Sequence, residues 1–245
     1  MRSNQKEMPI LEHIRELRNI ILASLLAYAI ACVVAFIFSN RIISLFTEPF
    51  RTIESLVNTS MVVSTIVEGF ATQIRITVIA GLILSLPVHL FGIIRFVFPG
   101  LTSREKRIVM SFLIVSLILI VFGSYFVYFM IVPMVIGFLT GPYFMPGNVG
   151  FLLNYQTNIF YLLTFILCSV LAFQAPIILE ILMILNIIER RQVWRACRYI
   201  VVGIFILSAI ITPPDFISQL AVALPLTALF FLAILVAKIF KFGES

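Results

Sequence analysis

Two acidic side chains stand among cations where they could bind a cationic ligand. Glu16 follows Glu12 by one helical turn in the N-terminal tail, and Glu105 is the lone acid of a short segment with Arg104 and Lys106. Carboxylates pair with guanidinium groups through forked, charge-assisted hydrogen bonds. If Glu16 and Glu105 lie close together in the fold, they would suit a ligand with adjacent guanidinium groups. The alternatives are a solvated helix face for Glu16 and local charge balance for Glu105.

Other common chemistries lack their motifs. The patterns GxxxxGK[ST], GxGxxG, GxSxG and HExxH are absent, and Asp215 is the only aspartate, whereas an intramembrane aspartyl protease needs two. The 3 cysteines and 2 histidines are scattered without metal-ligand or disulfide spacing. We therefore expect no enzyme, no metal and no cofactor.

The composition is that of a membrane protein. Of the 245 residues 62% are apolar and only 11% are charged, too few charges for a soluble globule of this size. Ile108 to Leu179 contains no charged residue and no histidine. The formal charge of +6 lies beside apolar runs rather than in a stripe, which favours a lipid bilayer over nucleic acid as the partner. We expect one polytopic membrane domain over residues 1–245.

Cutting the apolar runs at their charges predicts about six transmembrane helices in an all-α protein. The predicted spans cover residues 20–38, 76–94, 108–132, 158–187, 199–211 and 216–237.

The distribution of Lys and Arg predicts the orientation. Basic residues gather in the N-terminal tail, the second and fourth loops and the C-terminus, whereas the third loop has none. Because cytoplasmic loops carry the excess of Lys and Arg, both termini are expected on the cytoplasmic side of a cell (inner) membrane.

Span five is short. Tyr199 to Ile211 reaches only about 20 Å at about 1.5 Å per residue, so either protein covers it or the lipid thins around it. A re-entrant hairpin is the alternative. Asp215 follows Pro213 and Pro214 at the outer end, which predicts a stiff turn.

Three further features of the sequence carry predictions: an apolar stripe in the N-terminal tail, the third loop, and two glutamines. Leu11, Ile14, Leu17 and Ile21 recur at helical spacing, which predicts an amphipathic helix at the cytoplasmic interface. The third loop is turn-rich, which predicts a structured cap on the outer face. Gln174 and Gln219 lie within spans, where they favour contacts with partner subunits over internal packing.

Several motifs in order resemble the TatC family, the multi-spanning receptor component of the twin-arginine protein translocase, over nearly the whole chain. They are His13-Ile14-Arg15-Glu16-Leu17-Arg18, Glu48-Pro49-Phe50, Phe96 through Arg107, Gly123 with Tyr128, Phe129 and Pro133, and Thr212-Pro213-Pro214-Asp215 followed by Ser218-Gln219 and Pro225.

The resemblance implies a receptor for twin-arginine signal peptides of folded cargo, driven by the proton motive force. Its implied partners are TatA/TatB-like single-span proteins and further copies of itself. Glu16 and Glu105 correspond to the acids that bind the two arginines, with Leu17, Arg18 and Phe96 nearby. Pro49, Gln174, Asp215 and Gln219 are expected to serve as partner or structural sites.

The chain departs from the family pattern at four positions. Gln174 stands for a common Glu in span four, Phe231 for an acid in span six, Gly69 for a Pro and Arg75 for a Lys. These departures predict either partner contacts that are tuned differently or pairing with a particular TatA-like protein.

Two other functional classes are open on the sequence alone. A small-molecule or ion secondary transporter could use bent helices with polar residues, and uptake by vesicles lacking partner subunits would reveal it. A purely structural scaffold would bind no signal peptide.

Overall fold

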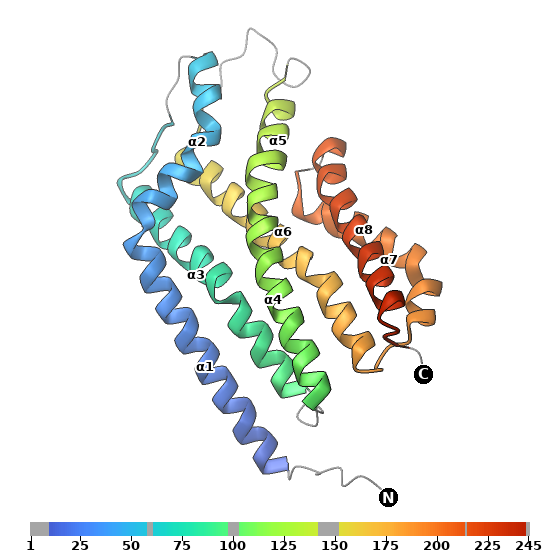
Figure 1. Ribbon diagram of the computed structural model, residues 1–245. Coiled ribbons are helices and arrows are strands. Elements are labelled where there is room, and N and C mark those ends of the chain that lie inside the picture. Colours follow the sequence, from blue (N-terminus) through green and yellow to red (C-terminus); the bar gives the residue numbers. More distant parts are fainter. Residues whose placement is uncertain (1–9, 58–60, 98–102, 142–151, 214, 244–245) are drawn as a thin grey trace, which may run out of the picture.

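The structure is a computed structural model that describes residues 10–57, 61–97, 103–141, 152–213 and 215–243, which are almost entirely helical (Figure 1). In chain order the elements are α1 (Ile10–Ile37), α2 (Ser39–Val57), α3 (Ile66–Val97), α4 (Ser103–Phe126), the π-helical turn η1 (Val127–Ile131), α5 (Val132–Leu139), α6 (Tyr155–Ile184), α7 (Arg190–Ile211) and α8 (Phe216–Ile239).

Six helical segments in the described residues are long and apolar enough to cross a membrane: α1, α3, α4 continued through η1 into α5, α6, α7 and α8. This confirms the predicted all-α polytopic fold. The two shortest are α7 with 22 residues and α8 with 24, against 25 to 31 for the others, as expected for spans five and six.

The central helix is α6, which crosses behind α4 in Figure 1. In its most apolar stretch 61% of the residues are buried, against 6% in α1 and in α7. Phe173, Ile159, Leu163 and Val170 of α6 are almost completely buried. A helix that is apolar all round is one that packs on all sides, and α3, α4 and α8 pack against it, whereas α1 packs mainly against α3.

Several helices extend beyond the apolar stretches read from the sequence. Because α1 is continuous from Ile10, the predicted amphipathic tail is part of the first span rather than a separate interfacial helix. Helix α3 begins at Ile66 rather than Ile76. Helix α7 begins at Arg190 rather than Tyr199 and has no hairpin within it. Its added turns carry Arg190, Arg191, Arg195 and Arg198.

Helix α2 lies where the sequence indicated an outer loop. Its apolar face buries Phe46 and Phe50, and Phe46 meets Tyr128 edge to face with ring centroids 6.2 Å apart. Pro49 lies inside this helix and cannot donate to the carbonyl of Leu45 one turn earlier. The Tyr128 hydroxyl donates to that carbonyl instead, which allows the helix to continue past Pro49.

The third span continues past Pro133, where the sequence predicted the start of an outer loop. The backbone N–H of Val132 donates to the carbonyl of Val127 in the π-helical turn η1, just before Pro133 in the first turn of α5. A π turn changes the hydrogen-bond register and thereby accommodates the missing proline donor. The predicted cap lies mostly in residues 142–151, outside the described residues.

The end of the molecule near α2 is joined across distant segments. A parallel bridge pairs Val62 with Asn154, and Asn154 Nδ2 donates to Ser64 Oγ at 2.9 Å. Arg75 of α3 lies 4.7 Å from the ring centre of Phe160. With the Gln156 amide oxygen turned toward it, the Arg75 guanidinium donates two hydrogen bonds at 3.0 and 3.2 Å. These contacts fix α3 to the start of α6.

Candidate functional site

Glu16 lies on α1 against α3, at the end of the molecule where α1 begins (Figure 1). Its Oε1 accepts a hydrogen bond from Arg95 Nε at 3.3 Å, and the two side chains are 17% and 62% exposed respectively. The carboxylate is therefore largely shielded from solvent, whereas its cation is not.

The second oxygen of Glu16 is free to accept. Oε2 is buried and has no hydrogen-bond partner among the residues that the structure describes. Because buried carboxylate oxygens are almost always hydrogen-bonded, an unpartnered one beside a pocket favours an incoming donor. A guanidinium with two parallel N–H groups is the donor that fits a carboxylate best.

A groove between α1 and α3 is lined by Leu17 and Phe96, the chain neighbours of Glu16 and Arg95. The ring of His13 stacks on Phe96 with centroids 4.4 Å apart and planes 14° apart. The groove encloses about 380 Å³ and is lined by Leu17, Ile20, Ile21, Ser24, Leu25, Tyr28, His89, Gly92, Ile93 and Phe96. A Cβ at Gly92 would lie 2.8 Å from Ile20 Cγ2, so a larger residue there would intrude on the groove. The arrangement suits an apolar chain that follows a cationic group.

Glu105 and Arg18 are the other charged residues predicted for the site, and neither is shown in contact with Glu16 in the described structure. Glu105 lies in the first turn of α4, and its side chain falls outside the described part of the structure. The start of α4, the start of α1 and the end of α3 lie at the same end of the molecule (Figure 1). The approach of the two carboxylates stays a prediction. Arg18 is exposed and donates to Asn19 Oδ1 at 3.4 Å, away from the groove lining.

Both intramembrane glutamines have hydrogen-bond partners within the chain. Gln174 is 2% exposed; its Oε1 accepts from Ser116 Oγ at 2.6 Å and its Nε2 donates to Val170 O at 3.4 Å. Gln219 Nε2 donates to Phe205 O of α7 at 3.1 Å. The hydrogen bonds of both glutamines are therefore those of internal packing, and a contact with a partner subunit stays a prediction.

Asp215 caps α8. Its Oδ1 accepts from the Ser218 backbone N–H at 2.7 Å, and its Oδ2 is buried without a partner in the described residues. A carboxylate at this position satisfies an N–H group that the helix leaves unpaired, so Asp215 has a structural role in starting α8.

Replacing Ser116 with alanine should lower the stability of the α4–α6 contact, because the buried Gln174 Oε1 would lose the one donor that it has among the described residues. Hydrogen bonds between membrane helices contribute about 0.6 kcal/mol on average and at most about 1.7. Thermal unfolding in detergent should show a lower midpoint. Ser111→Ala on the same helix, where Ser111 Oγ bonds only Arg107 O and is exposed, should leave the midpoint unchanged. Equal midpoints for the two variants would contradict the assignment.

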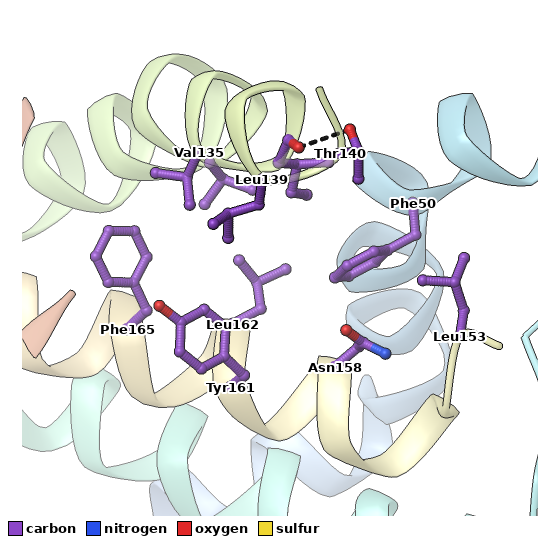
Figure 2. A pocket seen from close by; sticks show the side chains of 11 residues that line it. Phe50, Val135, Leu139, Thr140, Leu153, Asn158, Tyr161, Leu162 and Phe165 are labelled. Carbon is purple, nitrogen blue, oxygen red and sulfur yellow. Dashed lines mark hydrogen bonds between the residues drawn. The ribbon is translucent and has the colours of Figure 1, made fainter. Parts of the chain in front are cut away.

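A second cavity, of about 230 Å³, lies at the opposite end between α2, α5 and α6. Figure 2 shows Phe50, Val135, Leu139, Tyr161 and Phe165 pointing into it. Its polar groups are Thr140, whose hydroxyl donates to Ile136 O at 2.8 Å, the hydroxyl of Tyr161, and Asn158. With no carboxylate in its lining, it does not suit a cationic peptide.

The described residues hold no group of three or more His, Cys, Asp or Glu side chains that could bind a metal ion. Sequence reasoning missed Arg95 and His13 as neighbours of the Glu16 site. The signal for Arg95 was its position at the end of the second span, level with the start of the first.

A model of the family described as Sec-independent protein translocase protein (TatC) matches residues 12–225. The Sec-independent protein translocase protein TatC of Carboxydothermus hydrogenoformans is 31% identical over 237 residues, covering 96% of this chain and 95% of its own length. The protein of the same name from Escherichia coli (strain K12) is 27% identical over 239 residues, covering 97% and 91%.

The fold is similar to that of solved structures. A crystal structure of the twin arginine translocase receptor TatC in DDM matches with a TM-score of 0.80 at 29% identity, covering 95% of this chain and 100% of that chain. A second crystal structure of this receptor matches with a TM-score of 0.74 at 28% identity, covering 93% and 98%.

Proposed function

The chain belongs to the TatC family of Sec-independent protein translocase proteins, and we propose that it is the subunit that binds the twin-arginine signal peptides of folded cargo. It is a multi-pass membrane component of a protein translocase and not an enzyme. The proposal concerns which peptide it binds, where, and with which partners.

The observation that carries the proposal is the Glu16 carboxylate, with one paired and one unpaired oxygen, next in the chain to Leu17 of the α1–α3 groove. One oxygen meets Arg95 and the other is buried without a partner in the described residues. An arginine of the signal would donate to the free oxygen. Glu105, in the first turn of α4, would meet the second arginine.

The groove would hold the apolar segment that follows the arginines. Its lining, from Leu17 to Tyr28 on α1 and from His89 to Phe96 on α3, is largely apolar. Burying apolar surface yields about 25 cal/mol per Å², whereas an exposed ion pair yields only about 0.2 to 1 kcal/mol. The groove therefore supplies much of the affinity, and the carboxylates supply selectivity for arginine, with Glu16 adding affinity because it is only 17% exposed.

The proposal includes orientation and partners. Both termini lie on the cytoplasmic side of the cell (inner) membrane, as the distribution of Lys and Arg predicts. TatA/TatB-like single-span proteins and further copies of this chain complete the translocase, and the proton motive force drives transport.

A crosslinking assay tests the signal-binding role. The unmutated protein should crosslink a signal peptide with Arg-Arg more efficiently than one with Lys-Lys, because lysine cannot form the forked pair. Glu105→Ala should abolish this discrimination while crosslinking through the groove persists. Equal crosslinking of both peptides by the unmutated protein would argue against the proposal.

A further inference from the structure

A wide groove separates the start of α7 from the end of α8. It encloses about 810 Å³, within the range of about 300 to 1,000 Å³ usual for ligand sites. Its lining is Glu189, Arg190, Arg191, Trp194, Phe231, Ile234, Leu235, Lys238 and Gly243. None of these residues belongs to the Glu16 site.

One end of the groove is positively charged. Arg190, Arg191 and Lys238 contribute cations and Glu189 the one acid of the lining. The backbone N–H of Glu189 donates to Gln192 Oε1 at 3.2 Å as part of a capping box. The Glu189 side chain in turn accepts from the backbone N–H of Gln192, and three cations against one acid leave the lining with a positive balance.

The other part of the groove is apolar and faces outward. Trp194 is 59% exposed, Leu235 51% and Phe231 41%. The cations lie where α7 begins and α8 ends, so the apolar residues lie further along both helices. At about 1.5 Å per residue, Trp194 lies about 6 Å from Arg190 along α7. Phe231 lies about 10 Å from Lys238 along α8. Charge at the surface and apolar side chains below it follow the profile of one membrane leaflet.

The chain after α8 contributes Gly243 to the groove lining. Gly243, with a positive φ of 65°, accepts a hydrogen bond from the Arg190 backbone N–H at 3.2 Å. A Cβ at Gly243 would lie 2.9 Å from that nitrogen. The glycine therefore lets residue 243 lie against the start of α7, close to Arg190.

We propose that this groove binds an anionic phospholipid, with its phosphate on Arg190, Arg191 and Lys238 and an acyl chain along Phe231 and Leu235. Arginine pairs with phosphate through two parallel hydrogen bonds, and basic pockets between membrane helices bind anionic headgroups. Tryptophan favours the level of the headgroups. A free anion would use the cations alone and leave the apolar wall without a function.

Trp194 is the only tryptophan of the chain and reports directly on the groove. Bromine on lipid acyl chains quenches a nearby indole. In nanodiscs, brominated phosphatidylglycerol at a low mole fraction should quench Trp194 more strongly than the same fraction of brominated phosphatidylcholine. Each cation near an anionic surface strengthens association about fivefold, so the double variant Arg191→Gln with Lys238→Gln should lower the preference about twenty-fivefold.

The matched control is Arg195→Gln with Arg198→Gln, which removes the same amount of charge, from α7 alone, without touching the groove lining. It should keep the preference. Should the groove variant fail to fold, the unmutated protein still decides, because high salt should weaken its preference. Equal quenching by both lipids, release of the lipid by inorganic phosphate beyond the effect of sodium chloride, or protection of Trp194 by a bound partner helix would overturn the proposal.

Discussion

Replacing Glu16 with glutamine should weaken binding of a twin-arginine signal peptide on the order of thirtyfold. Removing one partner of a shielded charge pair costs about 2 kcal/mol or more, and Glu16 is only 17% exposed. The fold should be unaffected, because the Arg95 left behind is 62% exposed and water can solvate it. Fluorescence anisotropy of a labelled signal peptide with the purified protein in detergent measures the dissociation constant.

Two further variants isolate the role of Glu16. Glu189→Gln removes an exposed acid from the start of α7 and should leave signal binding unchanged. Arg95→Gln removes the cation that occupies Oε1 and should leave the affinity unchanged or raise it up to about fivefold, the range of an exposed ion pair. If Glu16→Gln binds the peptide as well as the unmutated protein, Glu16 is not the arginine acceptor.

Replacing Gly81 with valine should separate α1 from α3 and disrupt the groove between them. A Cβ at Gly81 would lie 2.6 Å from Cys32 Sγ and 3.1 Å from the Cys32 backbone N and Cα, which cannot rotate away. Overpacking of this kind costs about 1–3 kcal/mol. Because α1 packs mainly against α3, we expect both a lower unfolding midpoint in detergent and loss of signal-peptide binding.

Gly203→Val is the control, because nothing lies within 4 Å of the Cβ position at Gly203 on α7. It should leave the midpoint and the binding constant unchanged. A Gly81→Val protein with the stability of the unmutated chain would show that the two helices can move apart at no cost.

The spans were predictable because lipid imposes a simple rule. Backbone groups in hydrocarbon must bond within a helix, so Ile108 to Leu179, without a charge, had to contain helices crossing the membrane. The rule marks where lipid lies and not where a helix ends. Helix α7 continues from Tyr199 back to Arg190 because arginines at a helix end reach the polar interface without leaving the helix.

Helix α2 was not predicted because its stability depends on a distant residue. Pro49 in a helix interior usually indicates a break, and Tyr128, far along the chain, supplies the donor that Leu45 O lacks. The apolar positions Phe46 and Phe50 were the available signal. A sequence shows such a spacing, but it does not show which hydroxyl will reach an unpaired carbonyl.

The polar contacts of the site were predictable by type but not by partner. Glu16 was identified as a carboxylate suited to a guanidinium, yet its contact in the structure is Arg95, from another helix. Gln174 was recognised as costly in lipid, and Ser116 of α4 meets it. Partners of this kind depend on how helices rotate against one another, and the hydrophobic pattern of a helix that is apolar all round leaves that rotation open.

The central position of α6 also sets an order for biosynthesis. It is the fourth span to leave the ribosome, so α3 and α4 enter the bilayer before the helix they pack against exists. The close approach at Gly81 and Cys32 needs only α1 and α3, which can pair as soon as both are inserted. The nascent chain therefore forms a two-helix unit first and gains its interior only after residue 184 has been translated, with α7 and α8 joining last.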